Sequence, residues 1–185
     1  VQLEGDGQAD LGNHGGAEKA VCVYPYEHYA HWESELGKRL DVGAFGENLT
    51  TLGLLENEVR IGDIFRFGEA VVQVSQPRQP CFKIAMKHGV TDFPLLVQQS
   101  GFTGFYFRVL QEGRVSRDSA LVLAERHQQG VTVEFANRIM HTDKHDVDGI
   151  RTILDVPELS VNWRATFTKR LKGIEADTAK RLNGE

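Results

Sequence analysis

The spacing of apolar residues changes once along this chain, close to residue 130, and the change limits the folds open to it. Before that point, short runs of β-favouring residues such as Val59 to Phe67 are broken by glycines. After it, apolar residues recur at three- and four-residue intervals, as in Val133, Ala136 and Met140. Short strands with frequent glycine favour a curved or closed sheet, whereas the later spacing predicts helices.

The two halves together predict an α+β protein. We expect a β-rich domain with a curved sheet or β-barrel over residues 1–130 and a small three-helix domain over residues 131–185, with Gln128-Gln129-Gly130 at the boundary. The polar stretch from Glu175 to Glu185 is expected to fray at its end. The second and third helical stripes consist of Val147, Ile150 and Leu154, then Trp163, Phe167 and Leu171.

Several elements of the first half can be placed by pattern. Tyr29, Trp32 and Leu36 predict an aromatic helix face that ends at Gly37, and a short helix is expected after Thr91. Residues 104–111 and 120–126 predict a strand, turn, strand unit around Glu112-Gly113.

Charge and composition exclude several classes of function. The net charge of −5 is spread along the chain without a long lysine or arginine run, which argues against a nucleic-acid partner. No apolar stretch approaches the roughly 20 residues that span a bilayer, so we expect a soluble, cytoplasmic protein without a membrane partner. The chain begins at Val1 rather than methionine, and we expect that an N-terminal segment has been removed or is missing.

Cys22 and Cys81 are the only cysteines, too few for a disulfide framework or an iron-sulfur cluster. Cys22 lies in an apolar run and is expected to be a small core residue on a buried strand. Cys81 follows Pro77 and Pro80, which cannot continue a central strand, so its sulfur is expected to be held out on a rigid loop. Because Arg78 and Lys83 favour a thiolate, Cys81 fits a nucleophile or a soft metal ligand, with a buried structural cysteine as the alternative.

Two other segments offer groups that could bind a ligand. His14 is followed by two glycines, which allow a sharp turn or close approach to a ligand, although a plain turn explains them equally. Residues 45–51 offer an amide, a carboxylate and two hydroxyls that suit hydrogen bonds to a heterocycle or a phosphate, on Asn48, Glu47, Thr50 and Thr51. The alternative is a strand that enters a turn, with Asn48 bonded to local backbone.

Two apparent metal motifs are set aside. The stretch from Lys144 to Asp155 has the rhythm of a calcium loop, but Lys144 occupies the first ligand position, so a turn and a helix start are expected. The histidine pairs 28/31 and 141/145 have helical spacing without the glutamate of a zinc-protease motif, and exposed helix faces are expected for them.

Four motifs in order resemble the MOSC domain family, most closely its bacterial YiiM-type members. The C-terminal helices also resemble the small three-helix domain of that subgroup, so the similarity covers nearly the whole chain. The motifs are His14-Gly15-Gly16, Phe45-Gly46-Glu47-Asn48-Leu49-Thr50-Thr51, Ile61-Gly62-Asp63 and Pro77-Arg78-Gln79-Pro80-Cys81.

The resemblance implies a β-rich MOSC domain that binds molybdenum cofactor, with Cys81 as the molybdenum ligand. It makes His14, Asn48, Thr50, Arg78 and Lys83 candidates for contacts to the molybdopterin, its phosphate or the substrate. It also implies that N-terminal strands, which usually precede this region and help to line the pocket, are missing from this chain.

The leading hypothesis is therefore a molybdenum cofactor-dependent oxidoreductase. By the resemblance it reduces N-hydroxylated base analogues such as 6-hydroxylaminopurine, with electrons from a partner redox protein and with Cys81 as the catalytic metal ligand. His14 is a second catalytic candidate, as a proton donor, on the basis of its neighbourhood alone. The first alternative is a carrier of the cofactor or of sulfur on Cys81. The second is a thiol hydrolase or transferase that uses Cys81 with His14, for which no orienting acid can be identified.

Overall fold

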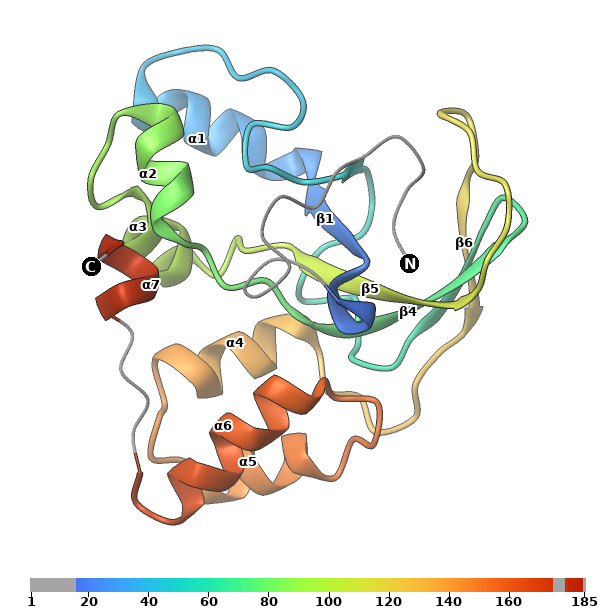
Figure 1. Ribbon diagram of the computed structural model, residues 1–185, viewed down its shortest axis with the longest axis vertical. Coiled ribbons are helices and arrows are strands. Elements are labelled where there is room, and N and C mark those ends of the chain that lie inside the picture. Colours follow the sequence, from blue (N-terminus) through green and yellow to red (C-terminus); the bar gives the residue numbers. More distant parts are fainter. Residues whose placement is uncertain (1–15, 175–178, 185) are drawn as a thin grey trace.

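A computed structural model describes residues 16–174 and 179–184 of the chain. Its strands form one curled, mixed sheet of half-barrel shape in the order β2-β1-β5-β4-β3-β6 (Figure 1). The α+β prediction is confirmed. The strands are β1 (Val21–Pro25), β2 (Leu49–Thr51), β3 (Ile64–Phe67), β4 (Ala70–Pro77), β5 (Phe105–Gln111) and β6 (Leu121–Glu125).

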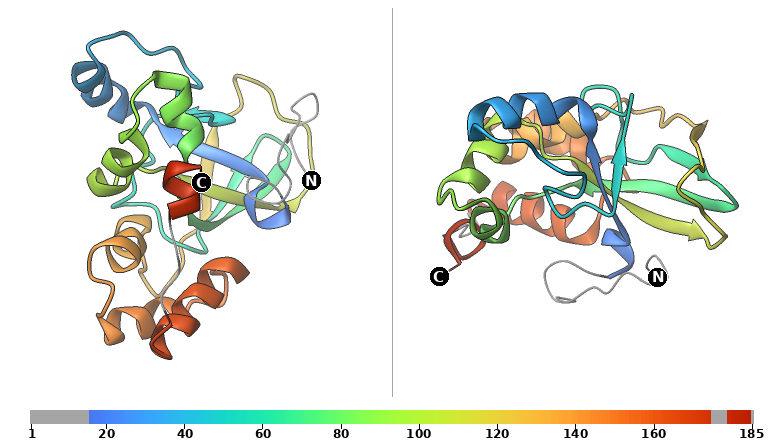
Figure 2. Two further views of the ribbon diagram at one scale, coloured as in Figure 1. Left: turned by 60° about the vertical axis from the view of Figure 1, so that its left-hand side comes forward. Right: turned by 90° about the horizontal axis from the view of Figure 1, so that it is seen from above.

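The helices lie in two groups around the sheet (Figures 1 and 2). The first group is α1 (Tyr29–Leu36), α2 (Phe82–His88) and α3 (Phe93–Ser100), and the second is α4 (Val133–His141), α5 (Val147–Leu154) and α6 (Val161–Leu171). The last helix, α7 (Ala179–Asn183), lies with the first group although it follows the second in sequence. Two short 3-10 turns, η1 (Ala17–Lys19) and η2 (Tyr26–His28), flank β1.

The sheet curls at irregular positions in its long central pair. The antiparallel register between β4 and β5 shifts twice, between Val71 and Val72 and between Val74 and Gln76. Such bulges bend a strand and increase its twist. β1 joins this pair by running antiparallel to β5 and parallel to β2.

The predicted strand, turn, strand unit over residues 104–126 is wrong in its pairing. Both strands exist, but β6 pairs with β3 at the edge of the sheet, while β5 lies between β1 and β4. Because β5 already has a hydrogen-bonded neighbour on each side, β6 has no place beside it. The segment that connects β5 to β6 passes over the turn between β3 and β4. There, Gly113 lies so close to Glu69 that a Cβ on Gly113 would come within 2.4 Å of the Glu69 backbone.

Two apolar clusters hold the molecule together. One fills the space between the sheet and α4 to α6, and it includes Phe65, Phe107, Ile153 and Phe167. The other is aromatic and lies under α1 and α3. In it, Trp32 Nε1 donates to the Tyr24 hydroxyl at 2.7 Å, and that hydroxyl donates to the Phe102 carbonyl at 2.9 Å. The predicted aromatic face of α1 is confirmed, as is its end at Gly37 with φ 64°.

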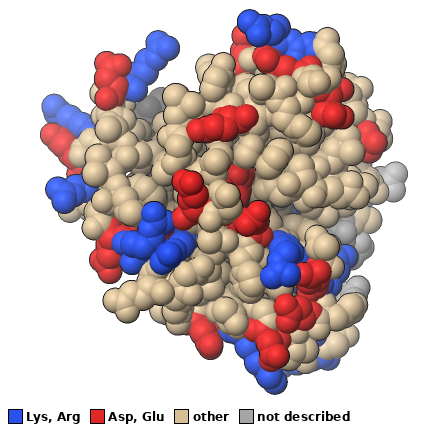
Figure 3. Space-filling model, turned by 180° about the vertical axis from the view of Figure 1, so that it is seen from behind, with Lys and Arg blue, Asp and Glu red and all other residues tan. Residues whose placement is uncertain are grey.

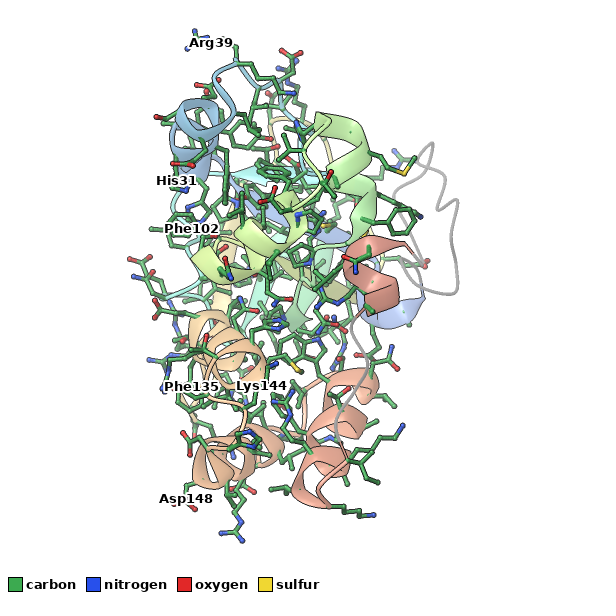
Figure 4. All side chains as sticks on the ribbon, turned by 90° about the vertical axis from the view of Figure 1, so that its left-hand side faces the viewer. His31, Arg39, Phe102, Phe135, Lys144 and Asp148 are labelled. Atoms are coloured by element: carbon green, nitrogen blue, oxygen red, sulfur yellow. The ribbon has the colours of Figure 1, made fainter. Side chains whose placement is uncertain are left out.

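Each helix of the second group begins with a side-chain cap. Figure 4 shows these helices below the sheet, with Phe135, Lys144 and Asp148 labelled. The side chains of Thr132, Asp146 and Ser160 accept hydrogen bonds from backbone N–H groups of α4, α5 and α6 at 3.0, 2.9 and 3.4 Å. The three predicted helices are confirmed, and Asp146 caps a helix, as expected for a turn rather than a calcium loop.

The expectation that both histidine pairs lie on exposed helix faces is half wrong. His31 and His145 are exposed, whereas His28 is buried and His141 is half-buried. His28 Nε2 lies 2.7 Å from the Glu56 carboxylate, whose other oxygen accepts the Gly104 N–H at 2.8 Å. His28 therefore links the end of β1 to the loop before β5, and it is a structural residue.

His141, at the end of α4, is held in its neutral form. Burial lowers its pKa to about 3, with help from the positive charges of Arg181, Arg170 and Lys144. Its Nε2 has no hydrogen-bond partner within the described ranges. An unfolded histidine titrates near 6.5, so between about pH 6.5 and pH 3 the unfolded chain binds a proton that the folded chain excludes.

We expect the free energy of unfolding to fall as pH drops through this window, by up to about 1.4 kcal/mol per pH unit from His141 alone. Urea titrations at about pH 7 and about pH 5 measure the loss, which should be smaller in His141→Gln than in the wild type. An equal loss in both proteins would assign the pH dependence to other groups.

The described residues contain no helix that is long and apolar enough to cross a membrane. Figure 3 shows one face of the molecule, on which acidic and basic side chains are interspersed and separated by wide uncharged areas. On this face there is no continuous basic stripe of the kind that follows a phosphate backbone.

Candidate functional site

Cys81 lies at the point where the chain leaves the sheet and begins α2. β4 ends at Pro77, and Cys81 is the N-cap of α2 in an extended conformation, with φ −132° and ψ 168°. Its carbonyl accepts the Ile84 N–H at 3.1 Å. The side chain is only 6% exposed, so the prediction of a sulfur held out in a loop is wrong. The prolines do end the strand, but the chain turns at once into α2, and Cys81 is buried at the start of that helix.

Arg78 connects three segments beneath this turn. It is buried, its N–H donates to the Gly104 carbonyl at 3.0 Å, and its Nη2 donates to the Phe45 carbonyl. Its Nη1 is also buried but has no hydrogen-bond partner in the described part of the chain. A buried guanidinium with an unused donor is costly unless a ligand or an anion completes it.

The groups around Arg78 are weak acids. Burial tends to lower the pKa of Arg78, but Cys22, Tyr106 and Cys81 together raise it above its ordinary value. Burial raises the pKa of the Cys22 thiol, and the nearby Arg78 offsets part of that rise. Burial likewise raises the pKa of Tyr106, which is hydrogen-bonded to Cys22. The site therefore combines two thiols and a phenol around one fixed positive charge, which favours an anionic or thiolate-bound ligand.

Asn48 joins β1 to β2 beside this cluster. Its N–H donates to the Cys22 carbonyl at 2.9 Å, and its Oδ1 accepts the Cys22 N–H at 2.7 Å. Asn48 also lines a groove of about 920 Å³ on the sheet. This volume is within the usual range for small-molecule and cofactor sites. Other lining residues are Val21, Leu49, Val72, Val109, Arg114 and Arg117.

Thr50 belongs to a network that shapes the preceding loop. Its hydroxyl donates to a Glu47 carboxylate oxygen at 3.0 Å, and the same carboxylate accepts the N–H groups of Gly43 and Phe45 and the hydroxyl of Tyr29. Burial and the Glu47 charge raise the pKa of Tyr29. Thr50 and Glu47 therefore fix the loop whose Phe45 carbonyl holds Arg78.

The neighbouring Thr51 supplies the second hydroxyl of the motif over residues 45–51, but it was not singled out as a site residue. Its side chain is buried, and its Oγ1 has no hydrogen-bond partner among the residues described. The adjacent pair Thr50-Thr51 indicated that one of the two hydroxyls would face inward, because alternate residues of a strand face opposite sides. Which of the two faces inward depends on the register with β1, where Thr50 lies beside Tyr24 and Thr51 beside Pro25.

The structure places the predicted site residues unequally. Cys81 and Arg78 come together, and Asn48 is connected to them through Cys22. Lys83 is exposed in the first turn of α2, two residues after Cys81. His14 lies outside the described residues. Cys22 and Tyr106 were not predicted as site residues, because nothing in the sequence shows that β1 and β5 bring them to Arg78.

A metal at Cys81 would need ligands from elsewhere. Within residues 16–174 and 179–184, no three histidine, cysteine, aspartate or glutamate residues are grouped so that they could hold a metal ion. One thiolate next to a buried cation instead suits a metal that arrives with ligands of its own, as a cofactor.

The curled half-barrel and its cysteine site define the class of protein. The MOSC domain profile matches residues 10–122, and the profile of the YiiM-like, 3-alpha helix domain matches residues 131–173. The chain belongs to the MOSC domain family, which confirms the resemblance seen in the sequence.

Its particular relatives are YiiM-like proteins. It is 59% identical to YflK of Bacillus subtilis (strain 168) over 168 residues, which is 91% of this chain and 76% of that protein. It is 42% identical to Protein YiiM of Escherichia coli (strain K12) over 187 aligned positions, or 99% of this chain and 83% of that one.

Two further matches bear on fold and activity. The crystal structure of YiiM from Geobacillus stearothermophilus is 47% identical with a TM-score of 0.83, covering 87% of this chain and 83% of that chain. A protein of Gibberella moniliformis (strain M3125 / FGSC 7600) named Reductase is 38% identical over 126 residues, which is 66% of this chain but only 22% of that protein.

Proposed function

We propose that this protein is a molybdenum cofactor-dependent oxidoreductase that reduces N-hydroxylated base analogues such as 6-hydroxylaminopurine. The observation that carries the proposal is the pairing of Cys81 with the buried Arg78, whose Nη1 has no partner in the described residues. The relative named Reductase supports an oxidoreductase, and membership of the MOSC domain family supports this choice of cofactor.

The residues present fit such a cofactor. Cys81 offers one soft thiolate, the ligand type that favours a sulfur-ligated metal. The Arg78 donor, which has no partner among the described residues, suits the negative charge of a thiolate-bound metal or a phosphate. The Thr51 hydroxyl, also without a partner among them, suits a polar edge of a pterin. Asn48 offers a further polar group from its groove, whose lining residues do not include Cys81 or Arg78. When bound, the cofactor would supply the two-electron chemistry that breaks the N–O bond.

The overall reaction consumes two electrons and two protons, converting the N–OH group to N–H with release of water. The two cysteines of the given sequence are too few for an iron-sulfur relay, and a partner redox protein is the electron donor that we propose. Within the site, Cys81 would anchor the metal, Arg78 would neutralise charge, and His14 remains our candidate for holding a proton near the substrate.

Two measurements test the proposal. The chain is purified from cells that make the cofactor, its molybdenum and pterin are measured per chain, and it is then assayed with 6-hydroxylaminopurine and a reduced viologen dye. We expect near-stoichiometric metal and formation of the amine. Metal-free, folded protein carrying a persulfide on Cys81 would instead favour the sulfur-carrier function, and bound cofactor without turnover would favour a cofactor carrier.

A further inference from the structure

The C-terminal helix α7 returns to the region of Cys81 after the three helices that precede it. Figures 1 and 2 show it beside α2 and α3, and Figure 4 shows it between α2 and α6. Gly184, just beyond α7, faces the ring of Phe82, where a Cβ would come within 3.1 Å. The helix is therefore closely seated against the residue that follows Cys81.

Arg181 of α7 makes two hydrogen bonds where this helix contacts α3 and the start of α2. Its Nη1 donates to the Pro80 carbonyl at 2.5 Å, and its Nη2 donates to the Gln98 side-chain oxygen on α3 at 2.6 Å. The Pro80 carbonyl and the Cys81 nitrogen belong to one planar peptide group. A hydrogen bond that fixes the position of the Pro80 carbonyl oxygen therefore also fixes the position of the Cys81 nitrogen. Pro80 is buried, and a buried carbonyl requires such a partner.

The same side chain brings a positive charge close to the sulfur. Burial lowers the pKa of Arg181, and negative charge on Cys81 acts in the opposite direction, which indicates that the two groups interact electrostatically. Arg181 approaches from the α2 and α3 side, whereas Arg78 approaches from the end of β4. Cys81 is thus within electrostatic range of two arginines, Arg78 close to it in sequence and Arg181 near the end of the given chain.

We propose that Arg181 is a positioning residue of the Cys81 site, which fixes the Pro80–Cys81 peptide and provides positive charge for an anionic ligand at the sulfur, so that α7 forms part of the site. This inference does not depend on which reaction the site catalyses. It assigns a role to a polar chain end that the sequence alone predicted to fray.

The test compares two alkylating reagents of similar size, one anionic and one neutral, and follows how the ratio of their rates changes between variants. Iodoacetate and iodoacetamide each form a carbon–sulfur bond with loss of iodide, and the ratio of their rates at one pH reports the electrostatic potential at the sulfur because the thiolate fraction cancels. The full-length chain is used free of cofactor, and the rates of Cys81→Ser are subtracted to remove any reaction of Cys22.

We expect Arg181→Met to lower the iodoacetate-to-iodoacetamide ratio by roughly threefold to tenfold, as for the loss of one nearby unit charge in a medium between protein and water. Arg181→Lys should keep the ratio within about twofold but change both rates together, because lysine keeps the charge and cannot hold Pro80 and Gln98 with a planar fork.

Arg164→Met is the matched control, since Arg164 also donates to two backbone carbonyls, those of Leu154 and Val156, but within the three-helix unit. It should leave the ratio unchanged. If Arg181→Met does not fold, Gln98→Glu tests the same charge without removing a contact, and it should also lower the ratio. Folded Arg181→Met or Gln98→Glu with the wild-type ratio would overturn the proposal.

Discussion

Replacing Cys81 with serine should leave the protein without molybdenum. A serine hydroxyl is not ionised near neutral pH and is a harder ligand than a thiolate, so it cannot replace the sulfur as a ligand for a soft metal. We expect metal content to fall to background and reduction of 6-hydroxylaminopurine to fall by more than about a hundredfold, beyond the effect of removing a group that only orients a ligand. Metal analysis and the dye-linked assay measure both.

Cys22→Ala is the matched control, because it removes the other buried sulfur of the described structure. The thiol of Cys22 also lies near Arg78 and Tyr106, but the alanine variant keeps the two backbone hydrogen bonds that Cys22 exchanges with Asn48. The alanine variant should therefore keep most of its metal. Equal loss of metal in both variants would show that packing around the cluster, and not ligation by Cys81, controls retention of the cofactor.

Replacing Arg78 with methionine should reduce cofactor binding strongly while it changes the free energy of unfolding only a little. The lost bond to the Phe45 carbonyl destabilises the fold, but a buried charge with an unused donor also disappears. We therefore expect the free energy of unfolding of the cofactor-free protein to fall by no more than about 2 kcal/mol. Cofactor content should fall by on the order of tenfold to a hundredfold, because the charge beside Cys81 is gone.

Urea denaturation and pterin analysis of the same preparations measure these two effects. Arg78→Lys is the control for charge, since it keeps a cation but lacks the planar group that can bond the Phe45 carbonyl and a ligand at once, and it should fall between the wild type and Arg78→Met in cofactor content. If Arg78→Met instead unfolds the chain while the folded fraction keeps its cofactor, Arg78 is a structural residue and the proposed site loses its main support.

Much of the fold could be predicted from local patterns. The α1 helix, the three helices after residue 131 and the strand that ends at the prolines are each determined by spacing and by the residues at their ends. The pairing of β6 with β3 could not be predicted, because pairing depends on which strand edges are already occupied. α2 was missed because its seven residues are too few to show a clear period.

The part of the candidate site that lies in one short segment of the sequence could be predicted. Cys81 and Arg78 lie within four residues of each other, and their surroundings suggested a reactive sulfur near a cation. Cys22, Tyr106 and Arg181 come from β1, β5 and α7, and only the tertiary structure brings them to that segment. The burial of Cys81 could not be predicted, since it depends on the helix that follows it.

The strand order described above also has a consequence for how the chain is made. Val23 of β1 pairs with Leu49 of β2 and also with Phe105 of β5, so one edge of this strand has to wait for a partner encoded 82 residues later. At about 5–20 residues per second, a ribosome needs on the order of 4–16 seconds to produce that partner. Such long-range pairing also slows refolding, whereas the contacts within α4 to α6 are local and form quickly. During synthesis, the segment that carries Cys22 therefore exists for seconds as an apolar strand whose β5-facing edge has no partner.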